Sequence, residues 1–280
     1  MHGLKTIVTV LAMMLPAVGI AAGTPDRVVS VNLCTDQLAM LLGRPGQLVS
    51  VSHLSADETI SLMSAEAVGL RINHGLAEEI FRLEPDLVVA GKYTTRATVN
   101  LLKRLGKHVE EFDPARSFED IAENTRRMGD LLGEEEAAER LVEQMHLELM
   151  RLRDEGKDPN RPVLGSFGTN SYTSGAETLE NDIVGKAGFR HLGDEIGIRG
   201  TTRLPLEALV LADPDYLMIW DRHRTNKSRS ASVLSHPALD ARFEEERRVS
   251  ADTRYWICGT PLTVGAIQRL RDAVRGSSAK

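Results

Sequence analysis

The chain has 280 residues, 42% of them hydrophobic and 26% charged, which is the composition of a globular protein long enough for two domains. Its formal net charge of −6 disfavours a nucleic-acid-binding protein, because such proteins usually carry an excess of basic residues. Aromatic residues make up only 4% of the chain, so a binding site can use few of them.

The first 23 residues, MHGLKTIVTVLAMMLPAVGIAAG, have the pattern of a secretory signal peptide. Lys5 precedes an apolar stretch over residues 7–20, and small residues follow as far as Gly23. The stretch is too short for a comfortable membrane span, and we expect cleavage after Ala22 or Gly23. Because the first cysteine, Cys34, lies beyond the cleavage point, we expect an exported protein without a lipid anchor.

After the signal peptide, predicted strands alternate with predicted helices. Apolar runs predict strands over residues 27–32, 47–52, 85–91 and 108–113. Helices are predicted over residues 34–43, 75–83 and 94–106, the first with Thr35 or Asp36 as its N-cap. This alternation is typical of parallel strands in an α/β layer. The run after Pro85 is continuously apolar, as expected of a strand that is buried on both faces and begins at a proline.

From Ser117 the pattern changes to two amphipathic helices. The first covers residues 117–133 and ends at Gly133. The second covers residues 134–156, begins with three glutamates and carries an apolar stripe at helical spacing. At about 1.5 Å per residue, roughly 20 residues form a rod about 30 Å long.

The strand–helix alternation then returns. Strands are predicted over residues 161–168, 214–220 and 248–249, and helices over 177–189, 204–212 and 260–274. A helix followed by Pro-Asp and a strand thus occurs once on each side of the rod. We therefore predict a signal peptide (1–23), an N-terminal α/β lobe (24–133), a connecting helix (134–156) and a C-terminal α/β lobe (157–280). Small ligands bind in clefts between such lobes.

The order of these segments resembles the periplasmic binding proteins of iron-siderophore and vitamin B12 ABC importers. The stretches that carry the resemblance are RVVSVN…DQLAMLLG, GLAEEIFRLEPDLVVAG, the connecting helix, SFGTNSYTSGAETLENDIVGKAGF and RLPLEALVLADPDYLMIW. The resemblance implies two Rossmann-like lobes joined by a single long helix, with the ligand between them. It also implies a monomeric periplasmic receptor that performs no chemistry, holds no cofactor and delivers a metal chelate to an ABC permease and its ATPase.

The resemblance also implies two docking carboxylates, because each lobe of such a receptor presents an acidic residue to arginines of the permease. In this sequence the matching positions are Glu78, in GLAEEIF, and Glu207, in LPLEALV. Glu79 is the alternative to Glu78.

Residues in the loops after the strands are the candidates for ligand contact, because these loops line the cleft. The candidates are His53, Asn73, Lys92, Tyr93, Arg96, Tyr172, Arg203, Arg222, Arg224 and Trp256. The tryptophans of the vitamin B12-binding proteins are missing at several places, and the cations instead suit an anionic chelate. A ferric siderophore is therefore favoured, cobalamin is next, and a cobalamin-specific or haem-binding receptor of the same fold is the alternative.

The two cysteines have two interpretations. An even pair in an oxidising compartment suggests a disulfide. The resemblance, however, places Cys34 and Cys258 on opposite sides of the cleft, where a bridge would hinder ligand entry. We therefore expect two cleft-lining thiols, with a disulfide as the alternative.

Three further function classes find little support. A bare metal ion needs three or four converging ligands, and His53, His74 and His223 have no matching acidic partners in the sequence. No hydrolase, metalloprotease or nucleotide-binding motif is present, so a secreted hydrolase would be of an unrecognised type. A sensor that docks on a signalling receptor is the third alternative.

Overall fold

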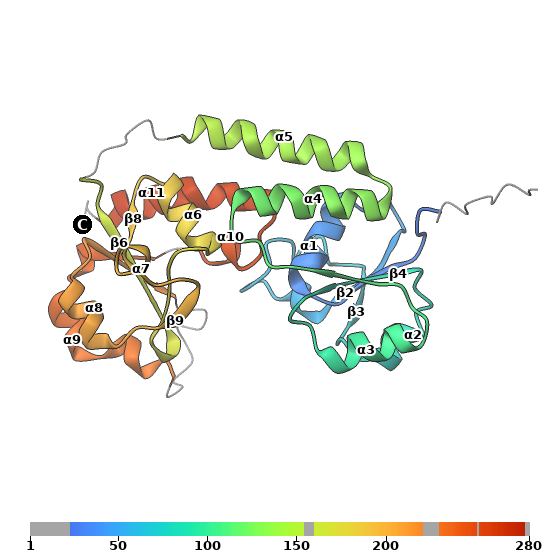
Figure 1. Ribbon diagram of the computed structural model, residues 1–280, viewed down its shortest axis with the longest axis horizontal. Helices are drawn as coiled ribbons and strands as arrows, with labels where there is room; N and C mark the ends of the chain where they lie inside the picture. The colour runs from blue at the N-terminus through green and yellow to red at the C-terminus, as the bar shows by residue number, and fades with distance from the viewer. Residues whose placement is uncertain (1–22, 154–159, 221–229, 251, 278–280) are drawn as a thin grey trace, which may run out of the picture.

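The computed structural model describes residues 23–153, 160–220, 230–250 and 252–277. The expected signal peptide, Arg222 and Arg224 lie outside the described residues, apart from Gly23. Figure 1 shows two α/β lobes side by side, with a long helix lying across both of them.

The first lobe is built on a five-stranded sheet in which every pairing is parallel. Its strands, in the order β3-β2-β1-β4-β5, are Arg71–Asn73, Leu48–Ser52, Val28–Ser30, Leu87–Gly91 and Val109–Phe112. Its helices are α1 (Leu33–Leu42), α2 (Ala77–Phe81) and α3 (Arg96–Arg104), with a short 3-10 helix η1 (His53–Ala56).

Strand β4 shows why its sequence is continuously apolar. Leu87 and Val89 pack in one hydrophobic cluster with α1, whereas Val88 and Ala90 pack in another with α2 and α3. Successive side chains of a strand point to opposite faces, so a strand between two helical layers buries every residue. The prediction of a buried parallel strand is confirmed.

The second lobe is built on a four-stranded parallel sheet and a separate hairpin. In the order β11-β10-β6-β8 the sheet strands are Arg248–Val249, Tyr216–Trp220, Val163–Gly168 and Arg190–His191, and the antiparallel pair is β7 (Tyr172–Ser174) with β9 (Thr201–Arg203). The helices are α6 (Leu179–Lys186), α7 (Leu192–Glu195), α8 (Leu206–Ala212), α9 (Pro237–Arg242), α10 (Arg254–Ile257) and α11 (Gly265–Ser277). The 3-10 helices are η2 (Thr169–Ser171), η3 (Ser232–Ser235), η4 (Glu245–Arg247) and η5 (Pro261–Val264).

The repeated Pro-Asp pair has the same structural role in both lobes. Asp86, just before β4, accepts hydrogen bonds at Oδ2 from the backbone N–H groups of Asp26 (3.1 Å) and Arg27 (2.9 Å), at the start of the neighbouring β1. Asp215, just before β10, accepts one at Oδ2 from the N–H of Val163 (2.7 Å), at the start of the neighbouring β6. Each aspartate therefore ties together the first residues of two paired strands.

The connection between the lobes is a pair of helices, α4 (Phe118–Leu132) and α5 (Glu135–Arg151). Gly133, with φ of 70°, ends α4 in the left-handed conformation that favours glycine, and the chain then reverses into α5. In α4, Ile121 packs in a hydrophobic cluster of the second lobe and Met128 in one of the first lobe. In α5, Val142 packs in the cluster of the second lobe and Ala138 in that of the first. The sequence predicted one connecting helix, and the structure adds α4 as a second element that spans both cores.

The first helix begins earlier than expected. Asn32, not Thr35 or Asp36, is the N-cap of α1, and its Oδ1 accepts a hydrogen bond from the N–H of Cys34 (3.0 Å). The Thr35 hydroxyl lies 2.8 Å from that of Ser30, and Asp36 is turned towards Ser52. Both side chains that the sequence favoured as N-caps are therefore engaged in other contacts and do not cap the helix.

Candidate functional site

A cavity of about 230 Å³ lies where the two lobes meet. The first lobe contributes residues that follow the carboxyl ends of β1, β4 and β5, and the second contributes Trp256 and Ile257 of α10, Gly259 after it and Leu179 of α6. The carboxyl edge of a parallel sheet is where α/β proteins bind ligands. The volume is smaller than the roughly 300 Å³ at the lower end of small-molecule pockets, so a metal chelate would project beyond it.

Three of the predicted ligand residues line this cavity: Lys92, Tyr93 and Trp256. The Tyr93 side chain is 82% exposed, which leaves its ring free to contact a ligand. The Lys92 ammonium group is paired with the Asp113 carboxylate, which also lines the cavity. The cavity lining thus offers two aromatic rings, those of Tyr93 and Trp256, and one cation, Lys92, whose charge is balanced by Asp113.

Close packing at the end of β4 holds the cavity wall in place. A Cβ atom on Gly91 would lie 2.9 Å from Cγ of Asn32, which is shorter than the distances that Cβ atoms keep from other atoms in proteins. Asn32 caps α1 and lines the cavity, so glycine at position 91 leaves room for the cap.

The stretch between β5 and α4 also contributes to the wall, and the sequence-based candidates did not include it. Asp113, Pro114 and Ala115 line the cavity, together with Asn124 of α4. The sequence analysis took residues at the ends of the other strands as ligand candidates. The same choice at the strand predicted over residues 108–113 would have included Asp113.

The structure gives no support to the predicted ligand contact of Asn73, which does not line the cavity. Its side chain is fully buried in the first lobe. Nδ2 donates to the Ser30 carbonyl (2.8 Å) and the Ser50 hydroxyl (2.9 Å), and Oδ1 accepts from the N–H of Gly75 (3.1 Å). The Asn73 amide of β3 therefore forms hydrogen bonds with β1 and β2 of the same sheet.

His53 is not among the residues that line the cavity. It follows β2, and its ring stacks on that of His74, which follows β3, with 5.4 Å between the ring centres. The backbone N–H of His74 donates to Glu79 Oε2 (2.8 Å), so this carboxylate is engaged locally. Contact of His53 with a ligand stays a prediction.

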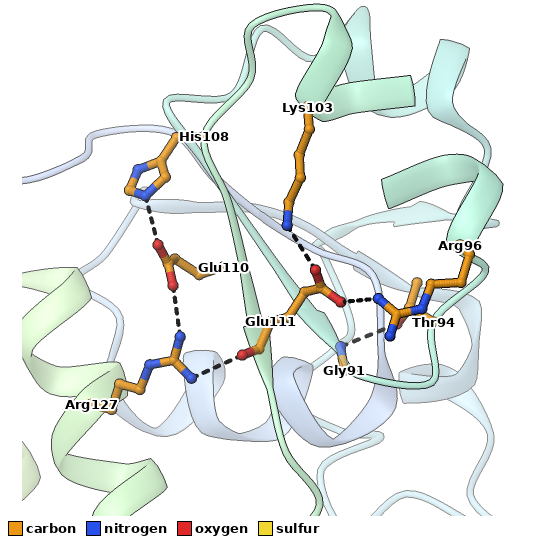
Figure 2. A network of polar contacts seen from close by, with 8 residues as sticks. All are labelled: Gly91, Thr94, Arg96, Lys103, His108, Glu110, Glu111 and Arg127. Carbon is orange, nitrogen blue, oxygen red and sulfur yellow. Dashed lines mark hydrogen bonds and ion pairs between the residues drawn. The ribbon is translucent and has the colours of Figure 1, made fainter. Parts of the chain in front are cut away.

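Arg96 is paired on the surface of the first lobe (Figure 2). Its Nη1 donates to Glu111 of β5 (2.7 Å), and Lys103 donates to the other oxygen of the same carboxylate (2.7 Å). The hydrogen bond from Lys103, aided by the charge of Arg96, lowers the pKa of Glu111. Arg96 does not line the cavity, so the described structure gives no support to its predicted ligand contact.

Tyr172 and Arg203 form a pair on the β7–β9 hairpin of the second lobe. They are register partners, and the guanidinium carbon of Arg203 lies 5.6 Å from the centre of the Tyr172 ring. Both are exposed and neither lines the cavity. A ligand contact for them also stays a prediction.

Cys34 and Cys258 form a disulfide, so the expectation of two free thiols is wrong. Their Cα atoms are 4.9 Å apart, within the range that a disulfide spans. The first turn of α1 therefore lies directly against the end of α10, with Cys34 Sγ 3.7 Å from the carbonyl oxygen of Ile257. The placement of Cys34 at the cavity agrees with the sequence analysis.

The two predicted docking carboxylates lie on corresponding helices of the two lobes. Glu78 belongs to α2 and Glu207 to α8, and both are exposed. Figure 1 places α5 along one side of the molecule and both of these helices towards the opposite side. In the described part of the chain neither carboxylate forms an ion pair, which distinguishes Glu78 from Glu79.

The described residues contain neither a metal-binding cluster nor a membrane-spanning helix. No group of three or more His, Cys, Asp or Glu side chains could hold a metal ion within those ranges. None of the helices described is both long and apolar enough to cross a membrane.

Comparison with known proteins places the chain among binding proteins. A cobalamin-binding protein of Halobacterium salinarum is 26% identical over 261 residues, which cover 91% of this chain and 70% of the relative. A periplasmic haem-binding protein from Roseiflexus superposes with a TM-score of 0.74 at 20% identity, covering 90% of this chain and 99% of that one. The periplasmic vitamin B12-binding protein of Vibrio cholerae gives 0.69 at 16% identity, covering 92% and 99%.

The two superpositions establish the two-lobed fold, which confirms the predicted architecture. The family model described as periplasmic binding protein matches residues 28–249, from the first strand of the first lobe to the last strand of the second. This match covers most of the chain, and the chain therefore belongs to the periplasmic binding protein family.

Proposed function

We propose that the protein is a periplasmic receptor that binds a metal chelate between its lobes and delivers it to an ABC importer. The observation that carries the proposal is the cavity lined from both lobes, with Tyr93 and Trp256 exposing aromatic surface to it. The receptor performs no chemistry, because its role is to bind, carry and release.

Among the chelates, we now rank cobalamin ahead of an anionic ferric siderophore. The sequence-based preference rested on five cations, of which Arg222 and Arg224 lie outside the described residues. Lys92 is paired with Asp113, whereas Arg96, which shares Glu111 with Lys103, and Arg203 do not line the cavity. Aromatic contact is therefore the main attraction that the described cavity offers, and the cobalamin-binding relative supports the same choice.

Isothermal titration calorimetry of the purified mature protein would test the proposal. Cobalamin, haem and ferric siderophores of the hydroxamate, catecholate and carboxylate types would be compared, each against the protein and its Trp256→Ala variant. We expect micromolar or tighter cobalamin binding that weakens at least about tenfold in the variant, or roughly 1.4 kcal/mol. Saturable binding of a siderophore with no response to cobalamin would overturn the ranking. No binding of any chelate would overturn the function itself.

The proposal includes export through the signal peptide without a lipid anchor, as a monomer. Mass spectrometry of the protein from the periplasmic fraction would show an unmodified N-terminus at Gly23 or Thr24. A mass increased by an acyl chain would contradict this part of the proposal.

A further inference from the structure

The disulfide between Cys34 and Cys258 joins the two lobes covalently. Cys34 lies in the first turn of α1, which packs in the core of the first lobe. Cys258 follows α10, whose Tyr255 and Trp256 pack against the core of the second lobe. The bond therefore connects residues 224 apart in sequence, one in each lobe.

The segment 254–259, which we call the strap, meets the first lobe at few points besides the disulfide, and its last residue, Gly259, packs against Ala115 and Ile121. Arg254 donates from Nη1 to the carbonyl of Glu58 (3.1 Å), and the Sγ atom of Cys34 lies 3.7 Å from the carbonyl oxygen of Ile257. The guanidinium group of Arg254 is itself held by Asp252, which it contacts with two nitrogens. One exposed hydrogen bond is a weak link, so the covalent bond is the main attachment of the strap to α1.

The strap also forms the wall of the cavity. Trp256, Ile257 and Gly259 line it from the second lobe, and Cys34 lines it from the first. Trp256 stands two residues before the buried Cys258, so any displacement of the cysteine moves the ring. The position of the aromatic ring in the wall thus depends on where the disulfide anchors the strap.

We propose that the Cys34–Cys258 disulfide is a clamp that fixes the spacing of the lobes at the cavity and positions Trp256 in its wall. Cys34 and Cys258 are positioning residues, acting through Trp256. The relevance of the clamp to ligand binding rests on the proposed function, but the clamp itself does not. Without the bond, the strap keeps its contacts with the second lobe and separates from α1.

A dithiol such as dithiothreitol can open the clamp. Cys258 is 1% exposed whereas Cys34 is half-buried and borders the cavity, so the attacking thiolate reaches Cys34 Sγ and the Cys258 thiolate leaves. The second thiol of the reagent then breaks the mixed disulfide and closes to a cyclic disulfide. The protein gains two electrons and two protons, and the reagent loses them.

Tryptophan fluorescence offers a test that needs no ligand, because the chain has only two tryptophans. In a Trp220→Phe background, Trp256 is the single reporter. Acrylamide quenching of its fluorescence would be measured before reduction, after reduction with dithiothreitol, and after reoxidation. The matched control is the same protein carrying Cys34→Ser and Cys258→Ser, which has no bond to open.

We expect the quenching constant to rise at least about twofold on reduction and to return on reoxidation. The serine variant should show the higher value at the start and should not respond to the dithiol. Unchanged quenching, in protein whose two thiols react with a thiol reagent, would overturn the clamp. Loss of the far-UV circular dichroism on reduction would also overturn it, because the bond would then hold the whole fold rather than the strap. If the clamp is present and no chelate binds, the proposed function fails alone.

Discussion

The carboxyl group of Asp36 is buried without a cationic partner. Oδ2 accepts hydrogen bonds from the hydroxyls of Ser52 (2.5 Å) and Ser55 (2.6 Å) and from the N–H of Ser52 (3.1 Å), while Oδ1 has no partner in the described structure. Burial raises the pKa of Asp36, and the serine hydrogen bonds only partly oppose this. Because Ser52 and Ser55 flank the turn that carries His53, the carboxyl group also fixes this turn.

We predict that Asp36→Asn removes a pH dependence of stability. The pKa of Asp36 is higher in the folded protein than its unfolded value of 3.8, so the folded chain keeps this proton to a higher pH than the unfolded chain does. The stabilisation of the folded state by this proton is therefore complete below pH 3.8. This stabilisation is lost as the pH rises through the pKa that Asp36 has in the folded protein. Urea unfolding between pH 4 and pH 7 should therefore show wild type losing stability relative to the variant as the pH rises. A constant difference between the two proteins across this range would contradict the prediction.

Gly91→Ala should disturb the cavity. The new methyl group would contact the Asn32 side chain and displace the cap of α1, so we expect a loss of about 1–2 kcal/mol in the free energy of unfolding. Cobalamin affinity should fall as well. Gly185→Ala is the matched control, since it lies in α6 with no atom within 4 Å of a new Cβ and should be neutral or stabilising by about 0.5–1 kcal/mol. Equal effects of the two substitutions would argue against a specific role of the Asn32 contact.

At the scale of elements, α2 and α8 carry the two predicted docking carboxylates. We predict that Glu78→Ala with Glu207→Ala leaves cobalamin affinity within about twofold, because both residues lie outside the cavity lining. Uptake by the reconstituted importer should fall at least about tenfold, the effect of roughly 1.4 kcal/mol lost from the docked complex. Glu136→Ala, at an exposed position on α5, is the control and should transport normally. Normal uptake by the double variant would remove the docking role.

The strands and long helices could be predicted from sequence because their patterns are local. The run Leu87–Gly91 is apolar throughout and is found as β4, and Gly133 ends α4 as expected. Whether Cys34 and Cys258 are bonded, and which groups Asn73 contacts, could not be decided from sequence, because both depend on segments distant in sequence. The two-residue strand Arg190–His191 was not predicted, since alternation cannot be recognised over two positions, although the equally short Arg248–Val249 was placed correctly.

At the scale of the whole molecule, α4 and α5 couple the two cores. A Cβ atom on Gly129 of α4 would lie 2.5 Å from Cβ of Ala138 on α5, so glycine allows the two helices to approach closely. Because both helices pack in clusters of both lobes, unfolding of one lobe removes contacts from the other. The molecule should therefore unfold as one cooperative unit.

We predict that Gly129→Ala lowers the free energy of unfolding by about 1–3 kcal/mol through overpacking. Its urea transition should shift equally by tryptophan fluorescence, which reports Trp220 and Trp256 of the second lobe, and by far-UV circular dichroism, which reports both lobes. A shift seen only by circular dichroism would mean that the lobes unfold separately.

The aspartates of the two Pro-Asp pairs have a consequence for the order of folding. Asp86 reaches a backbone N–H 59 residues earlier in the chain, and Asp215 reaches one 52 residues earlier, whereas the cysteines are 224 residues apart. Closing a short loop costs less chain entropy than closing a long one, so each lobe aligns its first strands before the distant ends meet. In the proposed export, Cys34 would leave the translocation machinery before Cys258, and with two cysteines only one pairing within the chain exists. We therefore expect the disulfide to form after the first strands of each lobe have aligned.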